Sequence, residues 1–591
     1  MKKFETSVNV RNLEICGAAF NALPLFLNRP LIKLLEDLGV PDRVFLELQS
    51  IAVNQLKVMT MSPTNTITYL DSTPVPKAVQ LGTLIRLLRN IDLNYHEDAF
   101  LYRVIEMSLV AKLQEMKYRG RIQVEGGYTL YGIVDETGVL KEGEIFVPVV
   151  DSTTGQRKVV KQARVAITRS PVMHPGDVQI VNAVDVPASS PLQALSNVVV
   201  FSQHGTRDLP SQLSGGDLDG DLYNVIYDPD LVPPQTYIAG DYPRLQPVEL
   251  TRDVELKDMS EFFVKFMESD QLGMVSNIHL QLADQKEHGT LDPDCIRLAQ
   301  MASTAVDYSK TGIPMNMKDC PRYNRCKPDF MCHSPHVFIS QEGLVELQDE
   351  KDTDEDDDFV ALGFDQERSR QRYYRSKKIL GQLYRAINDR EILEELHEHH
   401  IEASRAANAS ESLMKRLWKF LQGRASGFNV LYTHQLELAR VIRDNYEQNL
   451  SDLLWAYGPT PRTPVTEQEA WAGHILGRQY GPIGKPLREL SSTLRDRFEK
   501  VVEYANFRIE KGDDLMESIG DDPGELYGEP CNSREIERFP RALACMEVAM
   551  TEPGMHVKEL GELKSFRYIA AGAALREHER LCNTMPRYAA V

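Results

Sequence analysis

The chain has 591 residues, 42% of them hydrophobic and 26% charged, which is the composition of a globular protein long enough for roughly three to four domains. It contains no run of about 18 uncharged apolar residues and no amino-terminal secretory signal, so we expect an intracellular protein, nuclear or cytoplasmic, without a membrane span. The eight cysteines do not make a disulfide framework, and the formal net charge of −19 weighs against a nucleic-acid partner unless basic side chains cluster locally.

The first part of the chain is expected to be mainly helical. Residues 1–15 alternate in polarity like a strand. From about residue 29 to 118, apolar side chains recur at three-to-four spacing, as they do in amphipathic helices.

Between about residues 121 and 228 the pattern changes to short β-rich runs separated by Gly-, Asp- and Pro-rich turns, which predicts a compact barrel. After about residue 251 the pattern is helical again to about 454, interrupted by an acidic run at 346–358 that we expect to be a surface insertion. A Pro- and Gly-rich stretch at 458–464 precedes a mostly helical tail. The runs expected to form strands are 122–124, 128–131, 144–147, 158–160, 164–167, 178–181 and 198–201.

Two stretches concentrate positive charge. The first holds Arg157, Lys158, Lys161, Arg164 and Arg169, and the second, at 368–378, alternates basic residues with tyrosines. Basic side chains can follow a phosphate backbone while tyrosines stack on bases, but solvated helix faces more often explain such clusters. The charge pattern therefore permits a nucleic-acid partner and does not establish one.

The segment SGGDLDGDLY at 214–223 carries the clearest chemistry. Asp217, Asp219 and Asp221 place three carboxylates within five residues, where they would repel one another without a cation. The neighbouring glycines give the backbone freedom to turn all three carboxylates toward one centre. Mg²⁺ prefers oxygen ligands and is often held by a few carboxylates together with substrate phosphates. The segment therefore predicts a magnesium site suited to metal-assisted nucleotidyl transfer.

Three other interpretations fit the residues of this segment less well. An EF-hand loop that began at Asp217 would need Gly at its sixth position and Glu at its twelfth, where Leu222 and Asp228 stand. A haloacid-dehalogenase-like Mg²⁺-dependent phosphatase is the runner-up interpretation, although such an enzyme places its first Asp directly after a buried apolar strand and often has Thr where Asp221 stands. A solvated acidic turn does not need the flanking glycines, and residues 222–226 continue as an apolar strand.

Two further groups of metal-ligand residue types occur. Cys320, Cys326, Cys332 and His333 have a five-residue gap between the first two cysteines, whereas common zinc sites have two to four. We expect these residues to be unliganded. His397, His399 and His400 lie among glutamates in a helical pattern, and we expect a solvated helix face there.

These motifs resemble a known family. SGGDLDGDLY is similar to the Asp-x-Asp-Gly-Asp signature of eukaryotic RNA-dependent RNA polymerases of the RNA-silencing type, and RSPVMHPGD at 169–177 is similar to an upstream block of that family. The resemblance covers most of residues 1–390 and, thinly, the tail. Further similar blocks follow in family order at 132–147, 277–284, 305–312, 327–331 and 379–385.

The resemblance implies an α+β fold: a double-psi β-barrel catalytic domain, related to multisubunit RNA polymerase large subunits, flanked by a mainly helical connector, head and tail. Family members carry a long segment upstream of this position, so we expect either a fragment or a missing half supplied from elsewhere. The implied domains are the last strand or strands of a truncated first barrel at 1–15, a helical connector at 16–118, the barrel with the DLDGD metal site at 119–245, a mainly helical head at 246–457 with the acidic insertion 346–358, and a mainly helical C-terminal region at 458–591.

The resemblance also implies roles for individual residues. Asp217, Asp219 and Asp221 would be the catalytic ligands of Mg²⁺. Arg169 would contact the ribose or phosphates of the incoming nucleotide, since guanidinium groups suit such partners. Among the other implied substrate contacts, Lys310 would bind a phosphate, His174 would orient its loop, and Lys3 would face the active centre.

The implied function is that of an Mg²⁺-dependent RNA-directed RNA polymerase, a nucleotidyltransferase. It would use nucleoside triphosphates and a single-stranded RNA template to extend an RNA 3′ end, making double-stranded RNA for silencing and siRNA production, with silencing-pathway proteins as further partners. The alternative is a catalytically incomplete fragment or relic that serves as an RNA-binding or regulatory module. Primer dependence, template preference, oligomeric state and the activity of this chain without the upstream region stay open.

Overall fold

The structure is a computed structural model that divides into two compact units. Unit 1 comprises Met1–Ala52, Glu115–Cys332 and Gln371–Ile387, and unit 2 comprises the rest of the chain. The strand expected at 1–15, with Lys3, lies outside the described residues, as does the acidic run from residue 348 on. The structure describes residues 18–71, 75–151, 155–242, 246, 249–268, 272–313, 315–331, 337–339, 345–347, 373–406, 411–458, 463–476, 487–512 and 537–584.

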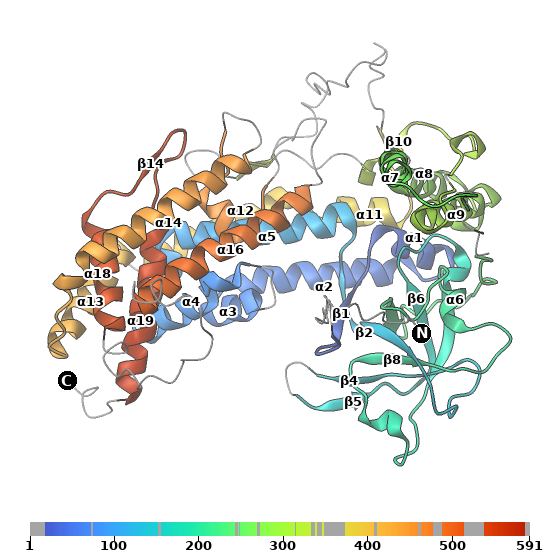
Figure 1. The fold of residues 1–591 in the computed structure, drawn as a ribbon, viewed down its shortest axis with the longest axis horizontal. Coiled ribbons are helices and arrows are strands. Elements are labelled where there is room, and N and C mark those ends of the chain that lie inside the picture. Colours follow the sequence, from blue (N-terminus) through green and yellow to red (C-terminus); the bar gives the residue numbers. More distant parts are fainter. Residues whose placement is uncertain are drawn as a thin grey trace, which may run out of the picture. The chain divides into compact units, whose positions relative to one another are not determined.

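Six strands of unit 1 form a closed ring, and three of them, β2, β6 and β8, are labelled in Figure 1. Each strand is hydrogen-bonded to the next in the order β2–β8–β3–β7–β6–β9, and β9 pairs back to β2. The β2–β8 and β3–β7 pairs are parallel, and the others are antiparallel. The expected mixed helix-and-sheet fold with a barrel is thereby confirmed. The strands are β2 (Gln123–Val134), β3 (Glu144–Phe146), β6 (Gln162–Arg169), β7 (Val178–Ala183), β8 (Val198–Phe201) and β9 (Leu222–Ile226).

Branched apolar side chains fill the barrel, as the alternation of the sequence predicts. Val165 and Ile167 of β6, Val199 of β8 and Val225 of β9 are all fully buried in one cluster. Outside the ring, β1 (Leu23–Phe26) pairs antiparallel with β2. A separate hairpin joins β4 (Pro148–Val150) to β5 (Arg157–Val159).

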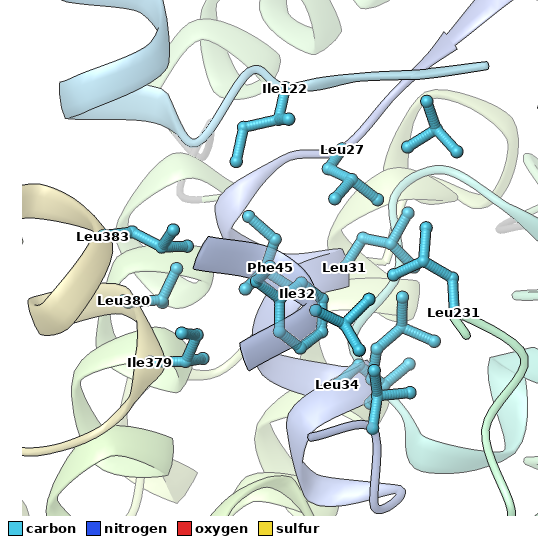
Figure 2. Close-up of a cluster of buried hydrophobic side chains, with 14 of the residues drawn as sticks. Leu27, Leu31, Ile32, Leu34, Phe45, Ile122, Leu231, Ile379, Leu380 and Leu383 are labelled. Atoms are coloured by element: carbon cyan, nitrogen blue, oxygen red, sulfur yellow. The ribbon is translucent and has the colours of Figure 1, made fainter. Parts of the chain in front are cut away.

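Helix α1 (Arg29–Asp37) is the centre of a second apolar core in unit 1. The Asn28 side chain caps the helix by accepting a hydrogen bond from the Leu31 N–H at 3.0 Å. Figure 2 shows Ile32 and its neighbours between the side chains of α11 (Ile379–Ala386) and Leu231. Residues far apart in the sequence thus share one core.

The remaining helices of unit 1 include the pair α8 and α9, which pack against each other around a third apolar cluster. Asp292 caps α9 through its side chain, which accepts from the Asp294 N–H at 3.0 Å. The other elements of this unit are α6 (Leu209–Gln212), α7 (Leu256–Glu268), α8 (Leu272–Gln285), α9 (Pro293–Val306), α10 (Tyr308–Thr311), β10 (Lys327–Pro328) and β13 (Tyr373–Tyr374), while α2 (Asp42–Thr60) and α5 (Ala99–Arg119) contribute residues to both units.

Unit 2 is mainly helical in its described part. Trp471 is fully buried in its core, where Phe100 meets the indole edge-on with ring centroids 5.4 Å apart. No helix in the described part of the chain is both long and apolar enough to cross a membrane. The elements are α3 (Pro63–Asp71), α4 (Leu81–Asn90), α12 (Asp389–Ala406), α13 (Leu413–Gly427), α14 (Leu436–Ala456), α15 (Glu467–Ala472), α16 (Leu487–Lys511), α18 (Arg538–Thr551), α19 (Phe566–Thr584), β11 (Val337–Ile339), β12 (Val345–Leu347), β14 (His556–Val557) and β15 (Gly561–Glu562).

The expectation of a solvated histidine face on α12 is wrong for His400. Its ring stacks on Tyr102 with centroids 3.6 Å apart, and its Nδ1 is buried without a hydrogen-bond partner. Burial lowers the pKa of His400 to about 4. The acidic neighbours in the sequence suggested water exposure, but the aromatic ring of α5 covers this side of the helix.

Candidate metal centre

The acidic segment forms the loop between α6 and β9. Helix α6 is capped by Asp208, whose side chain accepts from the Ser211 N–H at 2.9 Å. Ser214 and Gly215 then adopt φ angles of 52° and 65°, and Gly220 has φ of 128°. Such positive φ values suit glycine, and they turn the chain sharply before and after the carboxylates.

The three carboxylates meet at one point. Asp217, Asp219 and Asp221 each offer an oxygen, and these oxygens lie within 4.8 Å of one another. The Asp217 N–H donates to Asp221 Oδ2 at 2.9 Å, and the Asp219 N–H lies 3.3 Å from Asp217 Oδ1. Oxygen donors gathered this closely, with one carboxylate exposed, fit a hard divalent cation such as Mg²⁺. In the described part of the chain, no other three carboxylate, histidine or cysteine side chains come together in this way.

Arg169 lies beside the triplet because it ends β6 and is paired in register with Tyr223 of β9. Its Nε lies 2.7 Å from Asp221 Oδ2, and its Nη2 donates to Asp221 Oδ1 at 3.1 Å. Nη1 donates to the Ser214 carbonyl at 3.1 Å. The predicted substrate contact and a predicted metal ligand thus form a two-point ion pair, the geometry for which the guanidinium fork is suited.

Gly216 lies under this ion pair. A Cβ at this position would lie 2.7 Å from Arg169 Cδ and 2.7 Å from Tyr223 Oη. No side chain larger than hydrogen fits there without moving one of them. The close approach of the loop backbone therefore explains a glycine directly before Asp217.

A buried acid behind the loop has a structural role that sequence reasoning missed. Asp177 Oδ1 accepts hydrogen bonds from the Ser214 N–H, at 3.1 Å, and from the Tyr242 hydroxyl. Its Oδ2 accepts from the backbone N–H groups of Met173 and His174 at 3.1 and 2.9 Å. Burial raises the pKa of Asp177 to about 6, and these four hydrogen bonds partly oppose that rise. Asp177 thus joins the 173–177 turn to the start of the acidic loop.

His174 is placed to shape the same turn. Its Nδ1 accepts from the Gly176 N–H at 3.0 Å and caps the short 3-10 helix η3 (Pro175–Asp177). Burial lowers the pKa of His174, which favours the neutral ring that this acceptor role requires. The arrangement supports the predicted orienting role, and a contact with substrate stays a prediction.

The acidic loop forms one wall of a cavity of about 380 Å³. Helix α9 and the residues after it form another wall. Lys310 belongs to α10, next to the lining residue Thr311, but its side chain lies outside the described part of the structure. The lining residues include Arg169, Asp177, Ser214, Gly216, Asp217, Asp219, Asp221, Tyr242, Ala302, Ser303, Asp307 and Thr311.

The possible zinc ligands are only partly described. Cys320 and Cys326 are free thiols, while Cys332 and His333 lie outside the described residues. Cys320 packs against the apolar cluster of α8 and α9. The expectation that all four are unliganded stays a prediction.

Fold and site together define a barrel protein whose acidic loop is a candidate divalent-metal centre beside a cavity. Comparison with known proteins gives the family: the family model described as RNA dependent RNA polymerase matches residues 1–387. The chain belongs to this RNA-dependent RNA polymerase family.

Named relatives occur in plants and fission yeast. RNA-dependent RNA polymerase 6 of Arabidopsis thaliana is 30% identical over 547 residues, which are 85% of this chain and 38% of the relative. Probable RNA-dependent RNA polymerase 1 of Oryza sativa subsp. japonica is 34% identical over 322 residues, which are 54% of this chain and 43% of the relative. The chain thus spans about two fifths of the length of these relatives. Among solved structures, RNA dependent RNA polymerase QDE-1 from Thielavia terrestris matches with a TM-score of 0.47 and 16% identity, over 95% of this chain and 57% of its own.

Proposed function

We propose that this chain carries the metal-binding part of an RNA-directed RNA polymerase. The reaction would add nucleoside triphosphates to an RNA 3′ end on a single-stranded RNA template and yield double-stranded RNA for silencing. The observation that carries the proposal is the meeting of three carboxylates within 4.8 Å on a barrel loop at a cavity wall, in a chain of this family. Silencing-pathway proteins and a nuclear or cytoplasmic location belong to the same proposal.

Asp217, Asp219 and Asp221 would hold Mg²⁺. When bound, the ion would supply charge neutralisation at the transferring phosphate and position the attacking 3′-hydroxyl. The protein's own part is to keep the carboxylates convergent: the positive-φ residues turn the loop, and Asp177 ties its start to the 173–177 turn. Arg169 lines the same cavity and can bind phosphate or polar sugar groups.

We further propose that the closed barrel is of the double-psi type. The connector, head and tail would then follow the predicted ranges 16–118, 246–457 and 458–591, with the barrel at 119–245 and the last strand or strands of a first barrel at 1–15. Parallel β2–β8 and β3–β7 pairs inside an otherwise antiparallel ring support a barrel with crossing connections rather than a simple meander.

Two alternatives lead to different expectations. A non-catalytic relic that binds RNA would keep the barrel without needing the triplet to bind a cation. A haloacid-dehalogenase-like phosphatase would need its first Asp directly after a buried strand. Here the triplet follows the short helix α6 and precedes β9, so the structure gives the phosphatase no support.

The test is incorporation of labelled nucleotides on single-stranded RNA with Mg²⁺, using this chain and a version extended with the upstream region that the family resemblance implies. Template-dependent product from either form, lost in Asp219→Ala, supports the polymerase. The matched control is Asp230→Ala, which removes an exposed carboxylate that does not line the cavity. Absence of product from both forms, with RNA binding intact, supports the relic instead.

A further inference from the structure

The Arg169–Asp221 ion pair occupies the carboxylate that the metal centre would use. Both oxygens of Asp221 are engaged, Oδ2 by Arg169 Nε at 2.7 Å and Oδ1 by Nη2 at 3.1 Å. The Asp217 N–H donates to the same Oδ2 at 2.9 Å. Only about a fifth of each side chain is exposed, so water screens this pair less than it screens a surface salt bridge.

Among the described residues that line the cavity, most charged side chains are acidic, so the Arg169–Asp221 pair matters for the charge balance of the site. Asp177, Asp307 and the three carboxylates of the acidic loop line the cavity. Arg169 is the one arginine or lysine among the described residues that line it. Three carboxylates within 4.8 Å repel one another, and the guanidinium of Arg169, in contact with Asp221, supplies a positive charge that offsets part of that repulsion.

A divalent cation on the triplet would take over this role. It would place a second positive charge beside the guanidinium, and the two charges would disfavour each other. Gly216 lets the Arg169 side chain pack directly against the loop backbone, since a Cβ at that position would lie 2.7 Å from Arg169 Cδ. The freed guanidinium would still line the cavity, where an anionic nucleotide can accept its hydrogen bonds.

We propose that Arg169 is the resident counter-ion of the acidic loop and exchanges with the divalent cation. Asp221 holds the guanidinium while no cation is bound, and cation binding releases it toward the cavity for the phosphate or ribose of a nucleotide. The order of loading follows: cation first, then nucleotide contact by Arg169. The nucleotide step rests on the proposed function, whereas the exchange itself depends only on Arg169 and the three carboxylates.

The test measures cation affinity rather than synthesis. Mn²⁺ is titrated into the full chain and free Mn²⁺ is followed by electron paramagnetic resonance. We expect Arg169→Gln to bind Mn²⁺ about tenfold more tightly than the wild type, because a competing positive charge is gone. Arg169→Lys, which keeps the charge but loses the two-point contact, should lie between them. The matched control is Arg207→Gln, since Arg207 also lies near the loop but donates to Ser211 instead of a carboxylate.

A second measurement, of the melting temperature, checks that the variants still fold. Without cation, Arg169→Gln should melt at a lower temperature than the wild type, and Mn²⁺ should narrow that difference. Weaker or unchanged Mn²⁺ binding by Arg169→Gln would overturn the exchange, because Arg169 would then orient Asp221 for the cation or play no part. Tight Mn²⁺ binding, with no RNA synthesis by either this chain or the extended version, would refute the polymerase and leave the exchange standing. No Mn²⁺ binding by any form would overturn both.

Discussion

The hydroxyl of Tyr223 donates a 2.8 Å hydrogen bond to the backbone carbonyl of Asp217. Tyr223 is fully buried in β9, and its ring packs against Phe201 of β8 with centroids 4.8 Å apart. Burial raises the pKa of its phenol, so the hydroxyl keeps its proton as a donor at neutral pH. The barrel wall thus holds the first carboxylate-bearing residue of the acidic loop in place.

Tyr223→Phe should therefore weaken cation binding more than it weakens the fold. The ring stays in place, and the lost hydrogen bond should cost about 1 kcal/mol of unfolding free energy. Mn²⁺ affinity should fall several-fold because Asp217 is less well placed. The matched control is Tyr227→Phe, which removes a 3.2 Å hydrogen bond to the Glu125 carbonyl away from the loop. Equal Mn²⁺ affinities for both variants, measured by the same titration, would contradict this positioning role.

Gly216→Ala should damage both stability and the site. The added methyl would lie 2.7 Å from Arg169 Cδ and 2.7 Å from Tyr223 Oη, with the Pro210 carbonyl 3.0 Å away. Either the ion pair or the loop must move, and we expect a loss of about 1–3 kcal/mol in urea unfolding together with weaker Mn²⁺ binding.

The control for that substitution is Gly273→Ala in α8. A Cβ there meets no atom within 4 Å, and alanine suits a helix better than glycine, so stability should stay equal or rise slightly. If Gly216→Ala and Gly273→Ala had the same unfolding free energy and the same Mn²⁺ affinity, the loop would be able to move away from the added methyl group. The predicted packing role of Gly216 would then be wrong.

The barrel was predictable because its signals are local. β-branched runs such as Val198–Phe201 of β8 are buried throughout and could be seen without knowing their partners. The convergence of Asp217, Asp219 and Asp221 was equally local, since a short glycine-framed loop leaves them few ways to point apart. The proline in β1 hid that strand. Among the described residues β1 pairs only with β2, and such an edge strand can accommodate a proline.

The contacts that the sequence does not predict join residues that lie far apart along the chain. The motif at 169–177 does not predict the role of Asp177, because its partners Ser214 and Tyr242 lie 37 and 65 positions away. The same holds for the Arg169–Asp221 pair, separated by 52 positions. Strand pairing between β6 and β9 brings Arg169 and Asp221 together. The register of that pairing cannot be seen from the periodicity of a single sequence.

Addition of a divalent cation should stabilise the protein through the acidic loop. At a concentration of about 100 times the dissociation constant, a single site contributes about 2.7 kcal/mol to unfolding free energy. We expect Mg²⁺ or Mn²⁺ to raise the melting temperature of the wild type and of Asp230→Ala, and a chelator to reverse the rise. The melting temperature of Asp219→Ala should respond little, because a ligand is missing. An equal rise in Asp219→Ala would place the responsible site elsewhere.

Asp177 should make the stability of the protein depend on pH in a defined window. Burial raises its pKa in the fold from an ordinary 3.8 to about 6, so the folded protein binds this proton more tightly than the unfolded chain does. The stabilisation is therefore fully present below about pH 4 and is lost as pH rises through about 6. A shift of this size corresponds to at most about 3 kcal/mol.

The comparison that isolates this group is wild type against Asp177→Asn. Asparagine cannot titrate, and its amide nitrogen cannot accept the hydrogen bonds that one carboxylate oxygen accepts now, so the variant should be less stable at every pH. The difference in unfolding free energy should nevertheless shrink between pH 4 and pH 6.5, because only the wild type loses the stabilising proton. A difference that grows over this range would mean that the four hydrogen bonds outweigh burial and hold Asp177 ionised. The acidic loop would then be anchored by a charged group, and its anchoring would weaken rather than strengthen as the pH falls.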